Sequence, residues 1–144
     1  QYGHVFRSDA GFDSSYTSAQ FGAQFRATQR TGFRATVRFL DEDEDDGGND
    51  LTRWTGILGF NHDVASPFLG LGESWSISGF SRLDSDDYAD GREDDVTGIG
   101  VSLMTNLNDT TFVTAGVRRF ERTSTDPVFD ESNTIISLEA GLEF

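Results

Sequence analysis

The sequence predicts an all-β fold in which eight antiparallel strands follow one another within a single domain, residues 1–144. The main observation is that apolar and polar residues alternate with a period of two over most of the chain, as in strands with one apolar and one polar face. The second is that long and short connections alternate, which places all long connections at one end of an up-and-down arrangement. Helix signals are almost absent.

The alternation is clearest in the second and third predicted strands. Residues 16–28 place Phe21 and Phe25 on one face, with Ala19, Ala23 and Ala27 at the other positions of that face and polar residues opposite. Residues 32–40 repeat the pattern, with Phe33 on the apolar face. Most of the other segments follow the same rule, and the first is the least regular. The eight strands are expected at residues 4–12, 16–28, 32–40, 51–62, 73–83, 96–107, 111–123 and 133–144.

Two aromatic residues in the later strands fall on the polar parity. Phe80 interrupts the alternation in residues 73–83, and Phe120 does the same in residues 111–123. An extra residue in one strand shifts the alternation by one position. We therefore expect a β-bulge near Phe80.

The connections between the predicted strands fall into two kinds. The short ones contain turn residues, whereas the long ones hold most of the 25 acidic residues of the chain. Short turns at one end and long loops at the other are typical of outer-membrane β-barrels. The long acidic connections are residues 41–50, 84–95 and 124–132, and the shorter ones are 29–32, 63–72 and 108–110.

The last strand has the most specific pattern. Every second residue is apolar up to the final position, whereas soluble chains tend to fray at their termini. The apolar positions are Ile136, Leu138, Ala140, Leu142 and Phe144. This ending resembles the closing strand of a bacterial outer-membrane β-barrel, in which the terminal Phe and its alternating partners form the assembly signal.

In architecture, the whole chain resembles the small eight-stranded outer-membrane barrels of the OmpA and OmpX kind. The resemblance implies a transmembrane up-and-down barrel, a bacterial outer-membrane location with extracellular acidic loops, and insertion by the barrel assembly machinery. It also implies contact with outer-membrane lipid and lipopolysaccharide, and a structural, protective or adhesive role without catalysis. Gln1 would then follow a removed signal peptide.

Charge and composition narrow the classes of function. The net charge of −14 argues against nucleic-acid binding, which needs a basic surface. The chain has no cysteine, which removes disulfides and thiol chemistry. The mean hydropathy is −0.43, and no apolar run reaches the length of a membrane helix. Strands that alternate between lipid and lumen average to such a value.

Arginines supply all 11 basic residues, and several lie on the polar parity of the predicted strands. If that parity faces a lumen, the interior is cationic and needs carboxylate partners, because buried charges must be paired. An eight-stranded barrel is narrow enough for such a network to fill it. The predicted lumen network contains Arg26, Arg34, Arg38, Arg53, Arg118, Glu139 and Glu143.

Two acidic connections invite a calcium interpretation, because calcium takes six to eight oxygen ligands. Neither matches the spacing of a twelve-residue EF-hand loop, and a solvated, self-repelling loop is the simpler interpretation. Weak Ca²⁺ binding, which could bridge to lipopolysaccharide phosphates, is the alternative; no other cofactor is expected. Its candidate ligands are Asp41, Asp43, Asp45, Asp84, Asp86 and Asp90.

No catalytic site is predicted. The two histidines are His4 and His62, and the spacing of His62 to Ser66 does not match the adjacent His-x-Ser of outer-membrane lipid A deacylases. The topology also places His62 at the short-turn end, so it is interpreted as a residue at a strand end. No nucleotide or zinc motif occurs.

Two other classes remain open. The chain could be a subunit, homo- or hetero-oligomeric, or the C-terminal part of a larger outer-membrane or surface assembly, with its Gly- and Ala-rich faces as protein contacts. It could also be a soluble extracellular acidic β-sandwich that binds calcium or carbohydrate. The sandwich accounts for the acidic loops and the hydropathy, but not for the terminal Phe144 or the two kinds of connection.

Overall fold

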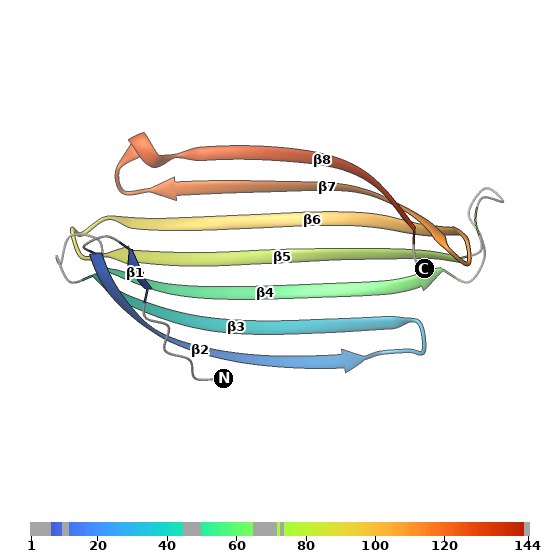
Figure 1. Ribbon diagram of the computed structural model, residues 1–144, viewed down its shortest axis with the longest axis horizontal. Coiled ribbons are helices and arrows are strands. Elements are labelled where there is room, and N and C mark those ends of the chain that lie inside the picture. The colour runs from blue at the N-terminus through green and yellow to red at the C-terminus, as the bar shows by residue number, and fades with distance from the viewer. Residues whose placement is uncertain (1–6, 10–11, 45–49, 65–71, 73, 143–144) are drawn as a thin grey trace.

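The computed structural model describes residues 7–9, 12–44, 50–64, 72 and 74–142. They form one antiparallel sheet in which each strand pairs with the next in sequence. Seven long strands follow the short β1, and in Figure 1 they lie side by side along the long axis of the molecule. The strands are β1 (Arg7–Asp9), β2 (Phe12–Arg26), β3 (Thr31–Glu44), β4 (Leu51–Val64), β5 (Ser74–Tyr88), β6 (Glu93–Asn108), β7 (Thr111–Ser124) and β8 (Glu131–Leu142).

The predicted all-β, up-and-down arrangement is thereby confirmed. The described residues do not show closure of the sheet into a barrel. Within the described residues, β8 pairs with β7 alone, and β1 pairs with β2 through three residue pairs. Residues 13–15, predicted to lie between the first two strands, belong to β2. The structure therefore shows a curved meander sheet with two edges.

The largest difference from the prediction is at the acidic end of the sheet. Residues 84–88 and 93–95, expected in a solvated loop, extend β5 and β6. A tight turn joins them, in which Gly91 has a φ of +86° and Tyr88 accepts a hydrogen bond from the amide of Gly91. The third acidic connection contains a short 3₁₀ helix, η2 (Pro127–Phe129), with Asp126 as its N-cap. Pairing with neighbouring strands thus overrides the low strand propensity of Asp.

The bulge expected at Phe80 is absent, because β5 keeps an unbroken register with both neighbours. Phe80 lies instead over Gly100 of β6, and Phe120 of β7 lies over Gly98. The two rings are 6.2 Å apart between centroids. Covering a strand glycine with an aromatic ring restores the contact that the missing side chain would make. The one register shift between described strands lies at Asn106–Asn108.

Candidate functional site

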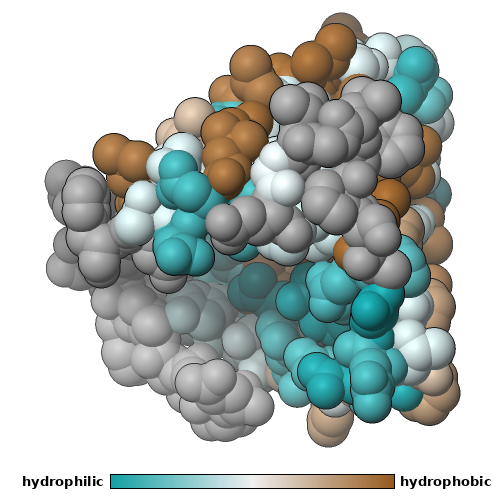
Figure 2. Space-filling model, turned by 90° about the vertical axis from the view of Figure 1, so that its right-hand side faces the viewer, coloured by the Kyte–Doolittle hydropathy of each residue, from teal (hydrophilic) through white to brown (hydrophobic). Residues whose placement is uncertain are grey.

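The alternating pattern gives the sheet two chemically different faces. Following the cross-strand partners from β2 to β8 places Gln24, Arg34 and Arg118 on one face, with Phe25, Phe33 and their neighbours on the other. Figure 2, which looks along the strands, shows hydrophilic side chains within the hollow of the curved sheet and hydrophobic ones on its outside. We call these the inner face and the outer face.

The outer face carries large apolar side chains that nothing covers. None of the described apolar side chains is buried, and Phe21, Leu138 and Ile136 are 77%, 78% and 82% exposed. The total accessible surface is 10422 Å². A compact soluble monomer of this mass exposes about 7,400 Å². The other exposed apolar residues of the outer face include Phe25, Phe33, Val37, Trp54, Leu58, Phe60, Leu83, Ile99, Val101, Val117 and Leu142.

Four residues of the predicted assembly signal lie where the pattern placed them. Ile136, Leu138, Ala140 and Leu142 share the outer face of β8, opposite Val117, Ala115 and other small or apolar residues of β7. The fifth, Phe144, lies outside the described residues.

The inner face at the acidic end holds an ion pair between neighbouring strands and another within β5. Arg53 of β4 donates two hydrogen bonds to Asp86 of β5, Nε to Oδ1 and Nη2 to Oδ2, both at 2.6 Å. Arg82 donates from Nε to both carboxylate oxygens of Asp84, at 3.0 and 2.8 Å. Both carboxylates are buried, whereas the two guanidinium groups are partly exposed. These pairs neutralise the carboxylates of Asp84 and Asp86, which the sequence predicted to lie in a loop.

A third arginine joins two of the acidic connections. Arg92, in the turn after β5, lies between the rings of Tyr88 and Phe129, 3.7 and 4.1 Å from their centroids. Its Nε is 3.5 Å from Asp94, whose side chain is fully buried. Neither carboxylate oxygen of Asp94 has a hydrogen-bond partner among the described residues. Stacking of a cation on two aromatic rings ties the β5–β6 turn to η2.

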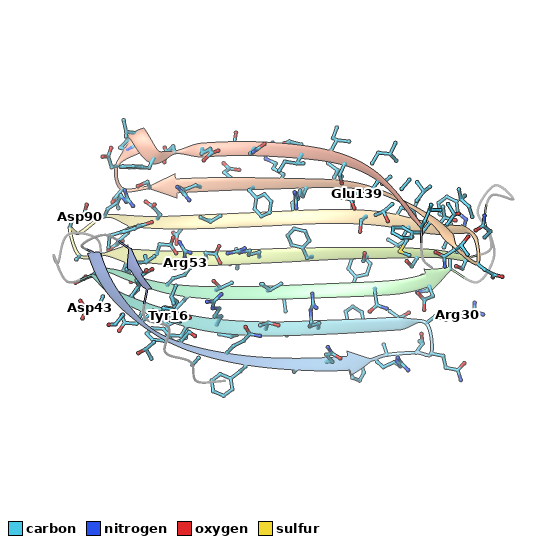
Figure 3. The ribbon with its side chains drawn as sticks, in the orientation of Figure 1. Tyr16, Arg30, Asp43, Arg53, Asp90 and Glu139 are labelled. Atoms are coloured by element: carbon cyan, nitrogen blue, oxygen red, sulfur yellow. The ribbon has the colours of Figure 1, made fainter. Side chains whose placement is uncertain are left out.

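The predicted calcium ligands are not brought together. Asp84 and Asp86 are buried on the inner face and bound by arginines. Asp90 accepts a hydrogen bond from the amide of Arg92 within its turn, and Asp41 accepts one from Thr52. Among the described residues, no group of three or more potential metal ligands occurs. Asp43 is exposed on the outer face, Figure 3 shows it apart from Asp90 and Arg53, and Asp45 lies outside the described residues.

The described residues of the predicted lumen network share one face of the sheet, but no ion pair joins these described residues to one another. Arg26, Arg34, Arg38, Arg53 and Arg118 all lie on the inner face, with Glu139. Arg53 has the partner Asp86, which the sequence reasoning had not assigned to it. Within the described part of the chain, no ion pair joins Glu139 to any of these arginines. Glu143 lies outside the described residues.

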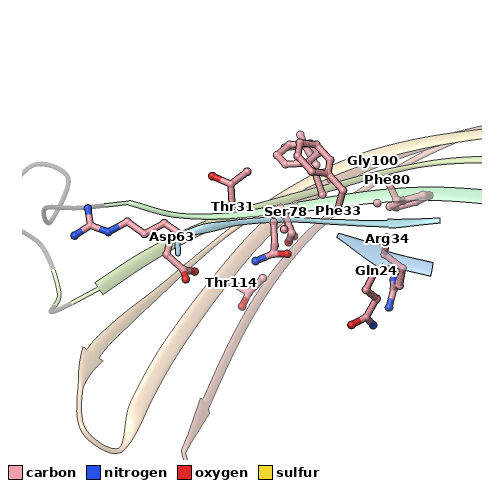
Figure 4. A pocket seen from close by; sticks show the side chains of 18 of the residues that line it. Gln24, Thr31, Phe33, Arg34, Asp63, Ser78, Phe80, Gly100 and Thr114 are labelled. Atoms are coloured by element: carbon pink, nitrogen blue, oxygen red, sulfur yellow. The ribbon is translucent and has the colours of Figure 1, made fainter. Parts of the chain in front are cut away.

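At the short-turn end, the inner face forms a cavity of about 860 Å³. Four arginines and two carboxylates line it, together with Ser, Thr, Asn and Gln residues and with the apolar residues Phe25, Phe33, Phe60, Val101 and Val117. Its charged residues are Arg26, Arg30, Arg34, Arg118, Asp63 and Glu139. Figure 4 shows Gln24, Arg34 and Phe80 among its lining.

His62 lies near the end of β4, as predicted, and is exposed. Its Nδ1 is 2.9 Å from the Thr31 hydroxyl, a contact that fixes the neighbouring strand end. His4 lies outside the described residues. The sequence did not single out Arg82, Arg92 or Asp94. Arg82, Asp84 and Asp86 alternate along β5, and continuing the predicted strand beyond residue 83 would have indicated Arg82.

The chain matches no protein-family model, and no curated protein or solved structure was found to be similar to it. Across the described residues, the structure contains no helix with the length and apolar character needed to cross a membrane.

Proposed function

We propose that this protein is a non-enzymatic β-barrel of the bacterial outer membrane, with a structural, surface-protective or adhesive role for its acidic end. The observation that carries the proposal is the exposed apolar outer face opposite a polar inner face. Each square ångström of apolar surface left in water costs about 25 cal/mol. Acyl chains of lipid remove this cost without requiring a protein core.

The size of the apolar band supports lipid as the cover. On β4 the exposed positions run from Trp54 to Phe60, and on β8 from Ile136 to Leu142. Six residues of strand rise about 20 Å. The lipid-facing band of a barrel is about 25 Å tall. On β2, Ala19 extends the band beyond Phe21, and Ala23 continues it between Phe21 and Phe25.

The strands continue beyond this band at their acidic end. There the outer face carries exposed carboxylates instead of apolar groups, and charged side chains do not lie against acyl chains at low cost. This end would stand in water outside the cell, where the loops could contact lipopolysaccharide. The exposed acidic residues of the outer face are Asp41, Asp43, Asp87, Asp95 and Glu121.

Barrel closure is part of the proposal. In the meander β2 and β8 run in the same direction, so an antiparallel closure needs a strand between them. β1, which pairs antiparallel with β2, has the required direction. Closure through it would make the inner face a lumen and would satisfy the backbone groups at both edges, as a membrane environment requires.

The test is refolding of the chain in detergent micelles and, in parallel, in plain buffer. Each sample is then run with and without boiling on SDS gels. The proposal predicts folding in micelles only, with an unboiled band that shifts on heating. Folding in buffer without a heat-shifted form would refute it.

The second candidate is a subunit of a larger barrel or surface assembly. It is favoured by the free edge of β8, which pairs on one side only in the described sheet. A heat-shifted band at the mass of a stable oligomer, instead of a monomer, would select this candidate. The soluble sandwich is less well supported, because the described strands form one sheet and not two stacked sheets.

A further inference from the structure

We propose that the inner-face cavity at the short-turn end binds a small phosphorylated, hydroxyl-rich molecule of the sugar-phosphate class. The proposal concerns a ligand site on the folded sheet and goes beyond the envelope role argued above. It rests on three features of the cavity: its unpaired arginines, the two glycines and the phenylalanine between them, and the hydrogen-bonding groups beside that row.

The first feature is an excess of positive charge. Arg34 and Arg118 line the cavity, and neither forms an ion pair with another described residue. At the acidic end of the same face, by contrast, Arg53 and Arg82 are held by Asp86 and Asp84. The cavity has four arginines against two carboxylates, so its net charge is positive within a strongly acidic chain. Arginine forks bind phosphate bidentately.

The second feature is the row that separates the two arginines. Cross-strand pairing places them at opposite ends of one row on the inner face. Between them lie only two glycines and one aromatic ring. The guanidinium of Arg34 lies over the first glycine, Gly59, with its Nε and Nη2 3.9 Å from the position that a Cβ would take there. The ring of Phe80 offers an apolar surface against which the face of a sugar can pack. The row is Arg34, Gly59, Phe80, Gly100 and Arg118.

The third feature is the next row toward the short turns. The hydroxyls of Ser78 and Ser102 are 2.9 Å apart, and Asn61 and Ser137 lie on either side in the same row. Hydroxyl and amide groups both donate and accept, which suits the hydroxyls of a sugar. The volume of about 860 Å³ is within the range of small-molecule sites. An apolar anion would leave these groups without partners.

The experiment uses the full chain refolded in non-ionic detergent, with folding verified by the heat shift on gels. Isothermal titration calorimetry then measures binding of glucose 6-phosphate, inorganic phosphate and glucose. We expect the sugar phosphate to bind more tightly than phosphate, and glucose alone to bind weakest. The gel check reports on the barrel proposal and the titration reports on the site, so a failure to fold is distinguished from a failure to bind.

The variants R34Q and R118Q should each weaken glucose 6-phosphate binding about tenfold or more, because each removes a charge-assisted contact. R118K should recover part of the loss, since it keeps the charge but not the planar fork. R119Q is the matched control, because Arg119 is the next residue but lies on the outer face, 56% exposed and beside Glu121. It should bind like the wild type.

Three results would overturn the proposal. The first is absence of glucose 6-phosphate binding to the folded wild-type chain. The second is unchanged binding in both R34Q and R118Q. The third is an equal loss in R119Q, which would mean that the ligand senses overall charge and not this cavity. The phosphate group could instead be carried by a lipid. In that case vesicles containing lipopolysaccharide would bind, whereas inorganic phosphate and glucose 6-phosphate would not.

Discussion

Removal of the Arg53–Asp86 pair gives the sharpest test of the inner-face ion pairs. Asp86 is 1% exposed and accepts two hydrogen bonds at 2.6 Å, whereas the side chain of Arg53 is 31% exposed. Truncating one member of a buried pair usually costs about 3–5 kcal/mol, because the other charge is left without a partner. The partial exposure of Arg53 lets water replace some of this interaction, which favours the lower end of that range.

A second effect lowers the cost further. Asp86 lies directly opposite Asp94 across β5 and β6, and both side chains are buried. Removing Asp86 therefore also removes a repulsion between like charges. We expect Asp86→Ala to lower the free energy of unfolding by about 2 kcal/mol. Asp87→Ala, one residue on but exposed on the outer face, is the matched control and should change it by less than about 0.5 kcal/mol.

A double-mutant cycle separates the pair from the repulsion. The chain and its variants Arg53→Ala, Asp86→Ala and the double variant are unfolded with urea in detergent micelles, with tryptophan fluorescence as the signal. Trp54 adjoins Arg53 in β4 and reports on this region. The expected coupling energy between the two residues is about 2 kcal/mol. A coupling below about 0.5 kcal/mol would refute the conclusion that this pair stabilises the inner face.

Two more predictions concern the outer face and the glycines of the sheet. Leu138→Arg, at a side chain 78% exposed on the outer face, should destabilise the protein in lipid by about 2–4 kcal/mol. Glu139→Gln on the inner face is the control and should change the stability little. Equal refolding yields of the two variants in lipid vesicles would argue against a lipid-facing outer face. Gly100→Ala should cost about 1–3 kcal/mol, because its new methyl group would overlap the Phe80 ring. Gly56→Ala is the control, since the atom nearest to its new methyl group would be 4.0 Å away. Stability is measured from urea midpoints. If adding Phe80→Leu restores the stability of Gly100→Ala, the ring is the cause of the loss, and no recovery would exclude the ring.

The acidic connections show where sequence reasoning failed and why. Asp84, Asp86 and Asp94 were interpreted as solvated loop carboxylates, yet they are buried in strands. The partner of Asp86 is 33 residues earlier in the chain. Strand register brings such residues together, and a local pattern carries no information about it. The bulge predicted at Phe80 was wrong for the same reason, because the glycine that Phe80 covers belongs to a neighbouring strand.

By itself, the sequence determined the strands, their order and the assignment of residues to two faces. These follow from alternation and turn residues, which act over a few positions along the chain. Only the tertiary structure decided which arginine meets which carboxylate, which aromatic ring covers which glycine, and where unpaired arginines gather around a cavity. Those features depend on contacts across strands, and such contacts exist only once the register of the whole sheet is set.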